Sequence, residues 1–538
     1  MNASTSSGSA SAFLDGPDGL SRLSALSGRV LAELDRHVVA DRPWTGFDPQ
    51  VLAAELAAWD LLPDQGVAPD QVIDEVGRLV LANGVAVTHP WTAAHLHCPP
   101  LVDAVAMEVA IGATNQSMDS FDQAPAATLV EDLLVRRLGG LLGLPPTRSG
   151  VMTAGGTASN LLGLTMAREH AARRSGVDLA SVGIADPAVA AVVSQWRIVT
   201  SAAAHFSVLR AAVLLGLGRR AVLAVPVGND GAMDPEALDR VVGGAADRGE
   251  TVIAIVGTAG TTDHGAIDPL EDLAEHAAAR GAWLHVDAAV GAALATSDTH
   301  RSRLAGIERA DSVTVDFHKL WWQPLGASAL LVARADDHGL VRDHSDYLDR
   351  DEDVADGVLN LVGRSLDTSR RFDALKVATS LRTTGRVALG GMVDALIDLA
   401  SAIGAHIDTR PDLELVAPPS TVTVLFRWIG DPTHAGPEVD ADADVGADLD
   451  AVNIGVQRQL FDTGRAVIGR TRIDGRVVLK LTLMNPTTSM DGLRELIDEV
   501  ASTARVISGR GIAGAAIAGG EITGRSIADG TDRGAPHE

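Results

Sequence analysis

The chain has 538 residues, which is too long for one ordinary hydrophobic core, so we expect two or three domains. Its net charge of −26 argues against binding to nucleic acid, and its 1 cysteine excludes an internal disulfide or a multi-cysteine metal site. The first residues lack the basic start and apolar core of a secretory signal, and no apolar run approaches the roughly 20 residues that span a bilayer. We therefore expect a cytoplasmic protein that binds neither nucleic acid nor membrane and holds no metal.

Helical patterns dominate the first part of the chain. Residues 1–25 are rich in Ser, Ala and Gly and are expected to be a disordered tail. Apolar residues then recur at helical spacing over 28–60 and 69–83, which predicts a helical segment at 26–105. The helical pattern continues over 104–144, where a polar stretch at 115–123 interrupts it. We expect that interruption to be a loop that faces a polar partner.

Short β-branched runs alternate with helical stretches from about residue 150. The expected strands are 197–200, 221–225, 252–256, 283–286 and 312–315. Because helical stretches such as 269–280 separate several of them, the pattern predicts βαβ crossovers and a mostly parallel sheet in a large α/β domain at 106–390.

A long helix at about 372–403, interrupted by Gly390 and Gly391, is expected to lead into a smaller α+β domain at 391–507. Strands are expected there at 421–428 and 477–483, and a helix at 490–507. Between them lies an acidic loop rich in Gly and Pro at 429–448, and we expect a mobile tail at 508–538.

Side-chain amines are scarce, because the chain contains only three lysines, Lys319, Lys376 and Lys480. Lys319 comes just after the expected strand 312–315, and functional residues of α/β proteins gather at strand ends. A desolvated lysine at such a place loses its proton readily and can form a Schiff base. The alternative is an ordinary surface lysine at the junction of a strand and a loop.

Four further segments carry candidate chemistry at the ends of expected elements. The Gly- and Thr-rich segment 153–160 precedes a helix, where backbone N–H groups and the helix dipole can hold a phosphate, although no lysine follows as in a nucleotide P-loop. His205 and the segment 258–262 each follow a strand, and Asp287 ends an apolar strand, where burying an acid is costly without a cation. Taken singly, these features also fit a helix cap, a structural histidine and an ordinary glycine turn.

Together the four features and Lys319 fit one ligand. Pyridoxal phosphate needs its phosphate held, its ring covered, its pyridine nitrogen kept protonated by a carboxylate, and its aldehyde captured by a lysine. The sequence supplies these groups in order along successive strand ends, so we expect pyridoxal phosphate as the cofactor.

The chain resembles the group II pyridoxal-phosphate-dependent amino acid decarboxylases over about residues 30–507. The motifs that carry this resemblance are 125–131, 155–160, His205, 258–262, 285–289 and His318-Lys319. The segments 94–100, 115–123 and 370–376 look like the branch of bacterial L-2,4-diaminobutyrate decarboxylases.

The resemblance implies the fold-type I architecture, as in aspartate aminotransferase, and a homodimer with its active sites at the subunit interface and 26–105 as a dimerisation segment. It assigns the Schiff base to Lys319, ring stacking to His205, the pyridinium partner to Asp287 and the opposite ring face to Ala289. The remaining implied cofactor residues are Thr157, Ala158, Ser159, Thr261 and His318.

Two departures from the family pattern concern the reaction itself. Val290 replaces an aromatic residue that many relatives have, and the stretch 348–369 lacks the catalytic loop tyrosine of several members. The only tyrosine is Tyr347, so the proton that replaces carbon dioxide is left to His205, water or Tyr347.

The expected reaction is decarboxylation of an L-amino acid to the amine and carbon dioxide. The resemblance favours a diamino acid, namely 2,4-diaminobutyrate, lysine or ornithine, whose distal ammonium would meet Asp119 or Asp122; alternatively these acids cap helices or face solvent. The rival functions are an aromatic-amino-acid or glutamate decarboxylase, an aldehyde synthase, an aminotransferase and a non-catalytic cofactor-binding protein.

Overall fold

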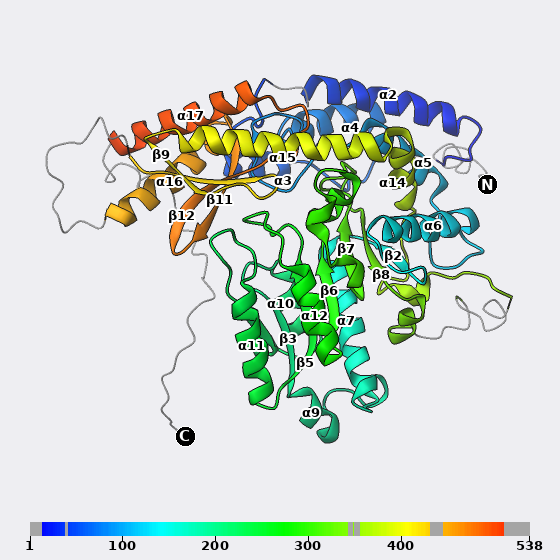
Figure 1. Cartoon of the computed structure of the whole chain (residues 1–538). Helices are drawn as coiled ribbons and strands as arrows, with labels where there is room; N and C mark the ends of the chain where they lie inside the picture. The colour runs from blue at the N-terminus through cyan, green and yellow to red at the C-terminus, as the bar shows by residue number, and fades with distance from the viewer. Residues whose placement is uncertain (1–12, 38–40, 343–347, 349–355, 431–444, 510–538) are drawn as a thin grey trace, which may run out of the picture.

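The computed structural model describes residues 13–37, 41–342, 348, 356–430 and 445–509. Within them the chain forms a seven-stranded and a five-stranded sheet, each packed against helices (Figure 1). Tyr347, residues 1–12 of the expected tail at 1–25, residues 510–538 of the expected tail at 508–538 and most of the acidic loop 429–448 lie outside the described residues.

The amino-terminal segment is helical and then adds a short strand. Its elements are α2 (Gly19–His37), α3 (Pro49–Ala57), α4 (Pro69–Val76), a π-helical turn (Gly77–Leu81) and β1 (Thr92–Ala93). Pro49 and Pro69 occupy first-turn positions, where the missing N–H of proline costs nothing. The expected tail is too long, because α2 already begins at Gly19 and packs against α4. Between α2 and the π-helical turn, the carboxylate of Glu33 occupies the space beside Gly77.

The larger sheet has the strand order β2-β8-β7-β6-β5-β3-β4, and only β8 runs against the others. Its strands are β2 (Ser149–Thr153), β3 (Trp196–Ser201), β4 (Val222–Val225), β5 (Thr251–Thr258), β6 (Trp283–Asp287), β7 (Ser312–Asp316) and β8 (Ser328–Val332). The five expected strands are present within one or two residues of their ends. Ala221 belongs to a 3₁₀ turn, and β2 and β8 were not expected.

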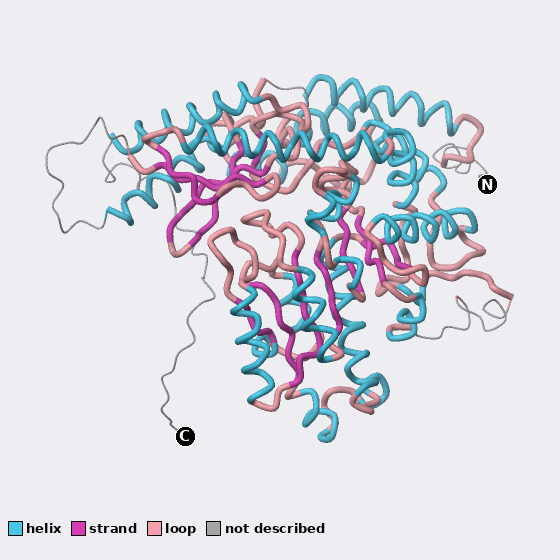
Figure 2. Tube along the Cα trace, in the orientation of Figure 1, coloured by secondary structure: helices cyan, strands magenta, loops and turns pink. Residues whose placement is uncertain are grey.

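Helices cover both faces of this sheet, because its strands carry apolar side chains on both sides. The helices between residues 102 and 280 are α5 (Val102–Thr114), α6 (Pro125–Leu141), α7 (Gly156–Arg174), α8 (Leu179–Val182), α9 (Pro187–Val193), α10 (Ser207–Leu214), α11 (Pro235–Asp247) and α12 (Leu270–Arg280). Of these, α6, α7, α11 and α12 contact the strands directly. In β3, Ile198 packs into the cluster formed with α7 and α10, whereas Val199 packs into the core shared with α11 and α12. Figure 2 shows the strands of this sheet enclosed between helices.

The smaller sheet has the order β1-β11-β12-β10-β9. Its later strands are β9 (Leu413–Ala417), β10 (Thr423–Trp428), β11 (Val467–Ile473) and β12 (Arg476–Thr482), and its helices are α15 (Arg386–Asp408), α16 (Val445–Asp462) and α17 (Met490–Gly509). Thr92 and Ala93 of β1 pair in parallel with Val467 and Ile468. The amino-terminal segment therefore completes the carboxy-terminal sheet, which the sequence did not predict.

The expected long helix at 372–403 is two helices, α14 (Ala374–Thr384) and α15, and the break falls at Gly385. Gly385 has φ +77°, a conformation that glycine adopts readily. Gly390 and Gly391, the expected interruption, lie inside α15. Gly390 allows close packing, because an added Cβ would lie 2.4 Å from the carbonyl oxygen of Thr296.

Among the described residues, α15 is the one helix that is long and apolar enough to cross a membrane by length and composition. Its buried side chains include Val393, Leu396, Ala400 and Ile403, which recur every three or four residues along one side of the helix. That side packs against β9, β10 and α17, so α15 has the environment of a core helix.

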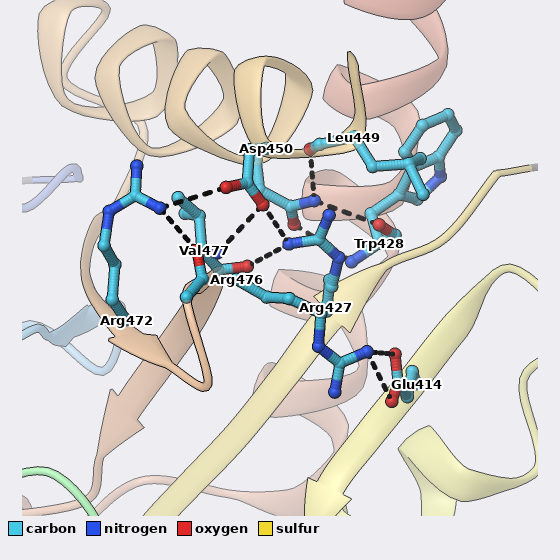
Figure 3. Close-up of polar contacts among 10 residues, drawn as sticks. Glu414, Arg427, Trp428, Leu449, Asp450, Arg472, Arg476 and Val477 are labelled. Atoms are coloured by element: carbon cyan, nitrogen blue, oxygen red, sulfur yellow. Dashed lines mark hydrogen bonds and ion pairs between the residues drawn. The ribbon is translucent and has the colours of Figure 1, made fainter. Parts of the chain in front are cut away.

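A polar network ties α16 to the smaller sheet (Figure 3). Oδ1 of Asp450 accepts hydrogen bonds from the Arg427 guanidinium and the backbone N–H of Val477, and Oδ2 accepts one from Arg472 at 3.1 Å. Burial would raise the pKa of Asp450, but these donors outweigh it and hold the pKa below its ordinary value. Arg427, which is almost fully buried, thus has a charged partner within the sheet.

Candidate active site

A pocket of about 300 Å³ lies at the carboxyl ends of β5, β6 and β7, where parallel strands bring their last residues to one edge of the sheet. Six residues singled out in the sequence line it together, namely Thr157, His205, Asp287, Ala289, His318 and Lys319. Thr258, the last residue of β5, also lines the pocket, as do Gly260 and Thr262 of the loop that follows. The fold thus gathers in one place groups that are up to 162 positions apart in the chain, from Thr157 to Lys319.

Lys319 lies in the turn that follows β7, and its side chain is 18% exposed. Its Nζ is 2.9 Å from Oδ2 of Asp316, the last residue of that strand. Nε2 of His318 is 3.7 Å from the same carboxylate oxygen. The amine is therefore confined to the pocket by a carboxylate that the strand end holds in place.

Contacts from distant parts of the chain hold this turn. Trp322 is fully buried and has φ +52°, which is rare for a bulky residue. Its N–H donates to the carbonyl oxygen of Lys319, and its indole Nε1 donates to Met484 in the smaller domain. The buried thiol of Cys98 donates to the carbonyl oxygen of His318, and burial raises the pKa of that thiol to about 12. Because several contacts fix the same turn, the unusual backbone of Trp322 is maintained.

Asp287 is the last residue of β6 and is 5% exposed. Oδ2 accepts a hydrogen bond of 2.7 Å from Nδ2 of Asn160, and Oδ1 accepts one of 3.2 Å from the N–H of Ala289. Both donors are neutral, so the carboxylate is oriented without being neutralised. A buried carboxylate of this kind favours a positively charged group in the pocket.

His205 follows β3 and reaches the same pocket. Its Nδ1 is 2.8 Å from Oγ of Ser207. Burial lowers the pKa of His205, with a smaller opposing contribution from Asp287 and a lowering one from Lys319. The imidazole is therefore neutral near physiological pH.

The segment 153–160, which the sequence predicts to bind a phosphate, lies at the start of α7 and at the edge of the pocket. Gly155, Gly156 and Thr157 line the pocket, and the N–H groups at the first positions of a helix have no acceptor within that helix. The N–H groups of Ala158 and Ser159 already donate to the carbonyl oxygen of Gly155. A Cβ on Gly156 would lie 2.9 Å from Oδ2 of Asp316, so glycine is what allows this carboxylate to approach the start of α7.

Five of the expected residues do not line the pocket of this chain. The hydroxyl of Ser159 is buried and bonded to Thr153, Ala158 is adjacent on the helix, and Oγ1 of Thr261 accepts from the N–H of Ala266 within its own loop. Oδ1 of Asp119 accepts from Ser117 at 2.6 Å, and Asp122 accepts from Ser120. The two acids belong to the loop at 115–123, as expected, but they do not face Lys319.

Several lining residues were not singled out in the sequence. The chief ones are Asn160, Asp316 and Gly326. Asn160 is the last residue of the segment 153–160, and Asp316 lies between the expected strand 312–315 and Lys319. Their roles depend on which side chains they meet across the sheet, for which the sequence holds no local signal.

The other two lysines are engaged elsewhere. Lys376 is fully buried and pairs with Glu108 at 2.7 Å and Asp373 at 3.0 Å. Lys480 of β12 pairs with Asp263 at 2.8 Å, which fastens the loop after β5 to the smaller domain. Of the three lysines, only Lys319 is in the pocket.

A second hollow, of about 400 Å³, lies between the start of α12 and the segment around Ser302. Its charged lining residues are Asp230, Asp268, Glu271, Asp272 and Arg303. It contains no lysine and no histidine, so it offers neither a nucleophilic amine nor a stacking imidazole.

Comparison with known proteins agrees with this chemistry. Residues 60–429 match the family described as pyridoxal-dependent decarboxylase conserved domain. The chain is 39% identical to the L-2,4-diaminobutyrate decarboxylase of Rhizobium meliloti (strain 1021) over 472 residues, which are 88% of this chain and 89% of that protein. It is 36% identical to the L-2,4-diaminobutyrate decarboxylase of Acinetobacter baumannii over 450 residues, 82% of this chain and 85% of that protein.

A solved structure supports the same conclusion for the fold. It is the glutamate decarboxylase domain of diaminobutyrate-pyruvate transaminase and L-2,4-diaminobutyrate decarboxylase from Vibrio parahaemolyticus. The TM-score is 0.81 at 36% identity, and the match covers 92% of this chain and 98% of that one. The expected fold-type I architecture, with its large and mostly parallel sheet, is confirmed.

Proposed function

Because the chain belongs to the pyridoxal-dependent decarboxylase family, we propose that it removes the α-carboxylate of L-2,4-diaminobutyrate. The products of that reaction are carbon dioxide and 1,3-diaminopropane. Identities of 39% and 36% to two proteins named L-2,4-diaminobutyrate decarboxylase, each over more than four fifths of this chain, carry the choice of substrate.

The residues in the pocket fit pyridoxal phosphate, the cofactor of the family. Lys319 offers the only lysine amine in the pocket, and Asp287 offers a buried carboxylate to a protonated ring nitrogen. The N–H groups at the start of α7 would hold the phosphate, with Thr157 and His318 beside it. His205 would cover one face of the ring and Ala289 the other.

When bound, the cofactor supplies an acceptor for the electron pair that remains after carbon dioxide leaves. Asp287 contributes by raising the pKa of the ring nitrogen, since a nearby negative charge favours the protonated form. Asp316 lies 2.9 Å from Nζ of Lys319 and holds that amine near the strand end. Asp287 and Asp316 are buried, and burial strengthens the electrostatic interactions that they make.

The distal ammonium of the substrate needs an acidic partner, and Asp119 and Asp122 are the proposed ones. Neither acid lines the pocket of its own chain. The proposal therefore requires a homodimer in which the loop 115–123 reaches the active site of the other subunit. Asp119 has the suitable charge and stays in place by bonding to Ser117 and Ser369.

Exposed apolar side chains on α5 and α6 support a homodimer. Val102, Val105 and Val109 lie on one side of α5 and are 82%, 46% and 52% exposed. Leu129 and Leu133, one turn apart on α6, are 54% and 55% exposed. Neighbouring apolar side chains of this size are typical of an interface between subunits. Sedimentation at micromolar concentration is expected to give twice the mass of one chain, and Val109→Asp is expected to shift the equilibrium toward monomer.

We also propose a cytoplasmic location without attachment to a membrane. The 1 cysteine, Cys98, is buried and free. The apolar side of α15 is used for packing within the smaller domain. Fractionation of producing cells is expected to leave the activity in the supernatant after membranes are removed.

A substrate panel tests the proposed reaction. The purified holoenzyme is given diaminobutyrate, ornithine, lysine, glutamate and an aromatic amino acid, and carbon dioxide and amine are measured. We expect the highest kcat/KM with diaminobutyrate. A preference for glutamate or an aromatic amino acid would contradict the proposed substrate. Dependence on an added keto acid would indicate an aminotransferase, and ammonia with peroxide would indicate an aldehyde synthase.

Replacing Asp119 or Asp122 by Asn tests the recognition of the distal ammonium. Replacing the acid that binds the ammonium is expected to lower kcat/KM for diaminobutyrate by roughly ten- to a hundredfold. The reason is that a buried charge-assisted hydrogen bond contributes about 1.5–3 kcal/mol. Asn at position 119 still offers an oxygen to Ser117, so the loop is retained. Equal losses on a neutral amino acid would contradict the assignment.

A mixed dimer shows whether the acid acts across the interface. Subunits carrying Lys319→Ala are combined with subunits carrying the responsible Asp→Asn replacement. If the acid serves the other subunit, the mixed dimer contains one site with both groups intact and regains activity on diaminobutyrate. If the acid serves its own subunit, mixing restores none.

A further inference from the structure

A directional chain of hydrogen bonds runs from the interior of the large sheet to the pocket. It begins at the indole of Trp283 in β6, passes through α7 at Asn160, and ends at His205. Trp283 can only donate, an ionised Asp287 can only accept, and each hydroxyl or neutral imidazole has a single hydrogen to give, while Asn160 has an NH₂ with two hydrogens and an oxygen that accepts. The position of each hydrogen therefore follows from its neighbours.

The carboxylate of Asp287 fixes the amide of Asn160. An ionised carboxylate only accepts hydrogen bonds, so the group 2.7 Å from Oδ2 of Asp287 is the NH₂ of Asn160. The amide oxygen then faces Nε2 of His285 at 2.9 Å and Oγ1 of Thr314 at 2.7 Å. Because that oxygen can only accept, both of these neighbouring atoms must donate to it.

His285 must therefore carry its hydrogen on Nε2. The ring is fully buried, and burial lowers the pKa of His285 to about 4, so it is neutral and its Nδ1 is an acceptor. The hydroxyl of Ser312, at 2.8 Å, donates to that Nδ1. Ser312 in turn accepts from Nε1 of Trp283, which can only donate. The hydrogen bonds from Trp283 to Ser312 and from Asn160 to Asp287 thus each lead, independently, to the same hydrogen position on His285.

A second series of hydrogen bonds leads from Asn160 through Ser207 to His205. The other N–H of the Asn160 amide donates to Oγ of Ser207 at 2.8 Å. The single hydrogen of Ser207 is then directed to Nδ1 of His205, also at 2.8 Å. The backbone N–H of Ser207 points at the same nitrogen at 3.4 Å, which is a second reason why Nδ1 accepts.

We propose that Asn160 and Ser207 are positioning residues that fix His205 as the neutral tautomer with its hydrogen on Nε2. The imidazole then presents a hydrogen-bond donor to the pocket and has no free lone pair with which to act as a base. As a neutral ring it also does not supply the proton that replaces carbon dioxide. His205 orients a negatively charged group of the bound substrate, and the proton comes from another acid. The inference holds for any amino acid substrate.

Neutron diffraction from deuterium-exchanged crystals of the holoenzyme tests the assignment directly. Deuterium is expected on Nε2 of His205 and of His285, with the deuterated nitrogen of Asn160 turned toward Asp287. Deuterium on Nδ1 of His205 would overturn the proposal. The same tautomer is expected in the apoenzyme, since no cofactor atom belongs to the chain of hydrogen bonds, and ¹⁵N spectra of histidine-labelled apoenzyme give this second readout.

Ser207→Ala and Ser207→Thr form a matched pair, because only the second retains a hydroxyl. The alanine variant is expected to give a mixture of tautomers at His205 in the ¹⁵N spectrum and to lower kcat by about tenfold, with a smaller change in KM. The threonine variant is expected to restore both the spectrum and kcat. A folded alanine variant with one tautomer and unchanged kcat would overturn the positioning role. If that variant does not fold, the neutron map of the wild type still decides.

Discussion

Lys319 differs from the other two lysines in what surrounds it. Lys376 and Lys480 serve in ion pairs that hold helices and domains together, whereas Lys319 lies against Asp316 within the pocket. The carboxylate that holds this amine lies in the pocket itself, so the amine can exchange that partner for a ligand bound there. The surroundings of the side chain, more than its type, therefore determine which lysine reacts.

Borohydride reduction of the holoenzyme tests this assignment. Reduction fixes the cofactor to the amine that holds it, so peptide mapping is expected to find the label on Lys319. Lys319→Ala is expected to lose the label and the absorbance of the bound cofactor, while its fold persists. A label on Lys376 or Lys480 would contradict the proposed site.

Asp287→Asn removes the charge that faces the ring nitrogen while keeping the size of the side chain. We expect the variant to bind the cofactor and to lose at least about a hundredfold in kcat, since each ~1.4 kcal/mol of lost stabilisation is a factor of ten. Single-turnover measurement of carbon dioxide release checks this. Unchanged turnover would refute the pairing of Asp287 with the ring.

At the scale of single elements, helix α15 contains two adjacent glycines, of which only Gly390 is closely packed. The helix runs through Gly390 and Gly391, where an interruption was expected. Gly390 meets the backbone at Thr296 and is buried, whereas the position of a Cβ on Gly391 has no atom within 4 Å. Two adjacent residues of the same type thus have different structural roles.

Alanine substitutions at these two positions are expected to have opposite effects on stability. Gly390→Ala would bring a methyl group 2.4 Å from the carbonyl oxygen of Thr296, so the backbone must shift at a cost of about 1–3 kcal/mol. Gly391→Ala adds a methyl in open space and is expected to stabilise the helix by about 0.5–1 kcal/mol. Urea unfolding curves of the two variants, measured side by side, check the signs. Equal destabilisation by both would contradict this description of the packing.

At the scale of the whole molecule, buried histidines make stability depend on pH. Burial, with a further contribution from Arg364, lowers the pKa of His338 from 6.5 to about 3. Between these values the unfolded chain binds a proton that the folded chain does not. The contribution of His338 to stability is therefore complete above about pH 6.5 and is lost as the pH falls toward 3.

Replacing His338 by Gln is expected to reduce the acid sensitivity of the fold. Gln keeps an acceptor for the hydroxyl of Ser149, which lies 3.1 Å from Nε2 of His338. One titrating group changes the free energy of unfolding by at most about 1.4 kcal/mol per pH unit. The slope of the free energy of unfolding against pH is therefore expected to fall by up to that amount in the variant. Urea unfolding at several pH values below 6.5, at one protein concentration, measures the slope. An unchanged slope would show that His338 is protonated in the folded state.

The sequence by itself determined the cofactor chemistry and the class of fold. Lys319, Asp287 and His205 each follow a predicted strand, and strand ends of a parallel sheet meet at one edge, so local patterns were enough to bring them together. The five strands of β-branched residues were predictable because a fully buried strand is apolar on both faces. The Gly- and Thr-rich start of α7 was recognisable because helix starts bind anions through backbone groups.

Other features were decided by the tertiary structure alone. The pairing of β1 with β11 joins residues about 375 positions apart, and two residues of strand carry no pattern that identifies a partner. The break falls at Gly385, whose φ is +77°, and not at Gly390, whose missing side chain lets the continuous helix α15 pack against Thr296. The hydrogen bonds that orient Asp287 and His205 meet at Asn160, whose partners come from β6, β7 and α10. A hydrogen bond needs its two atoms within about 3 Å, and only the folded chain sets that distance.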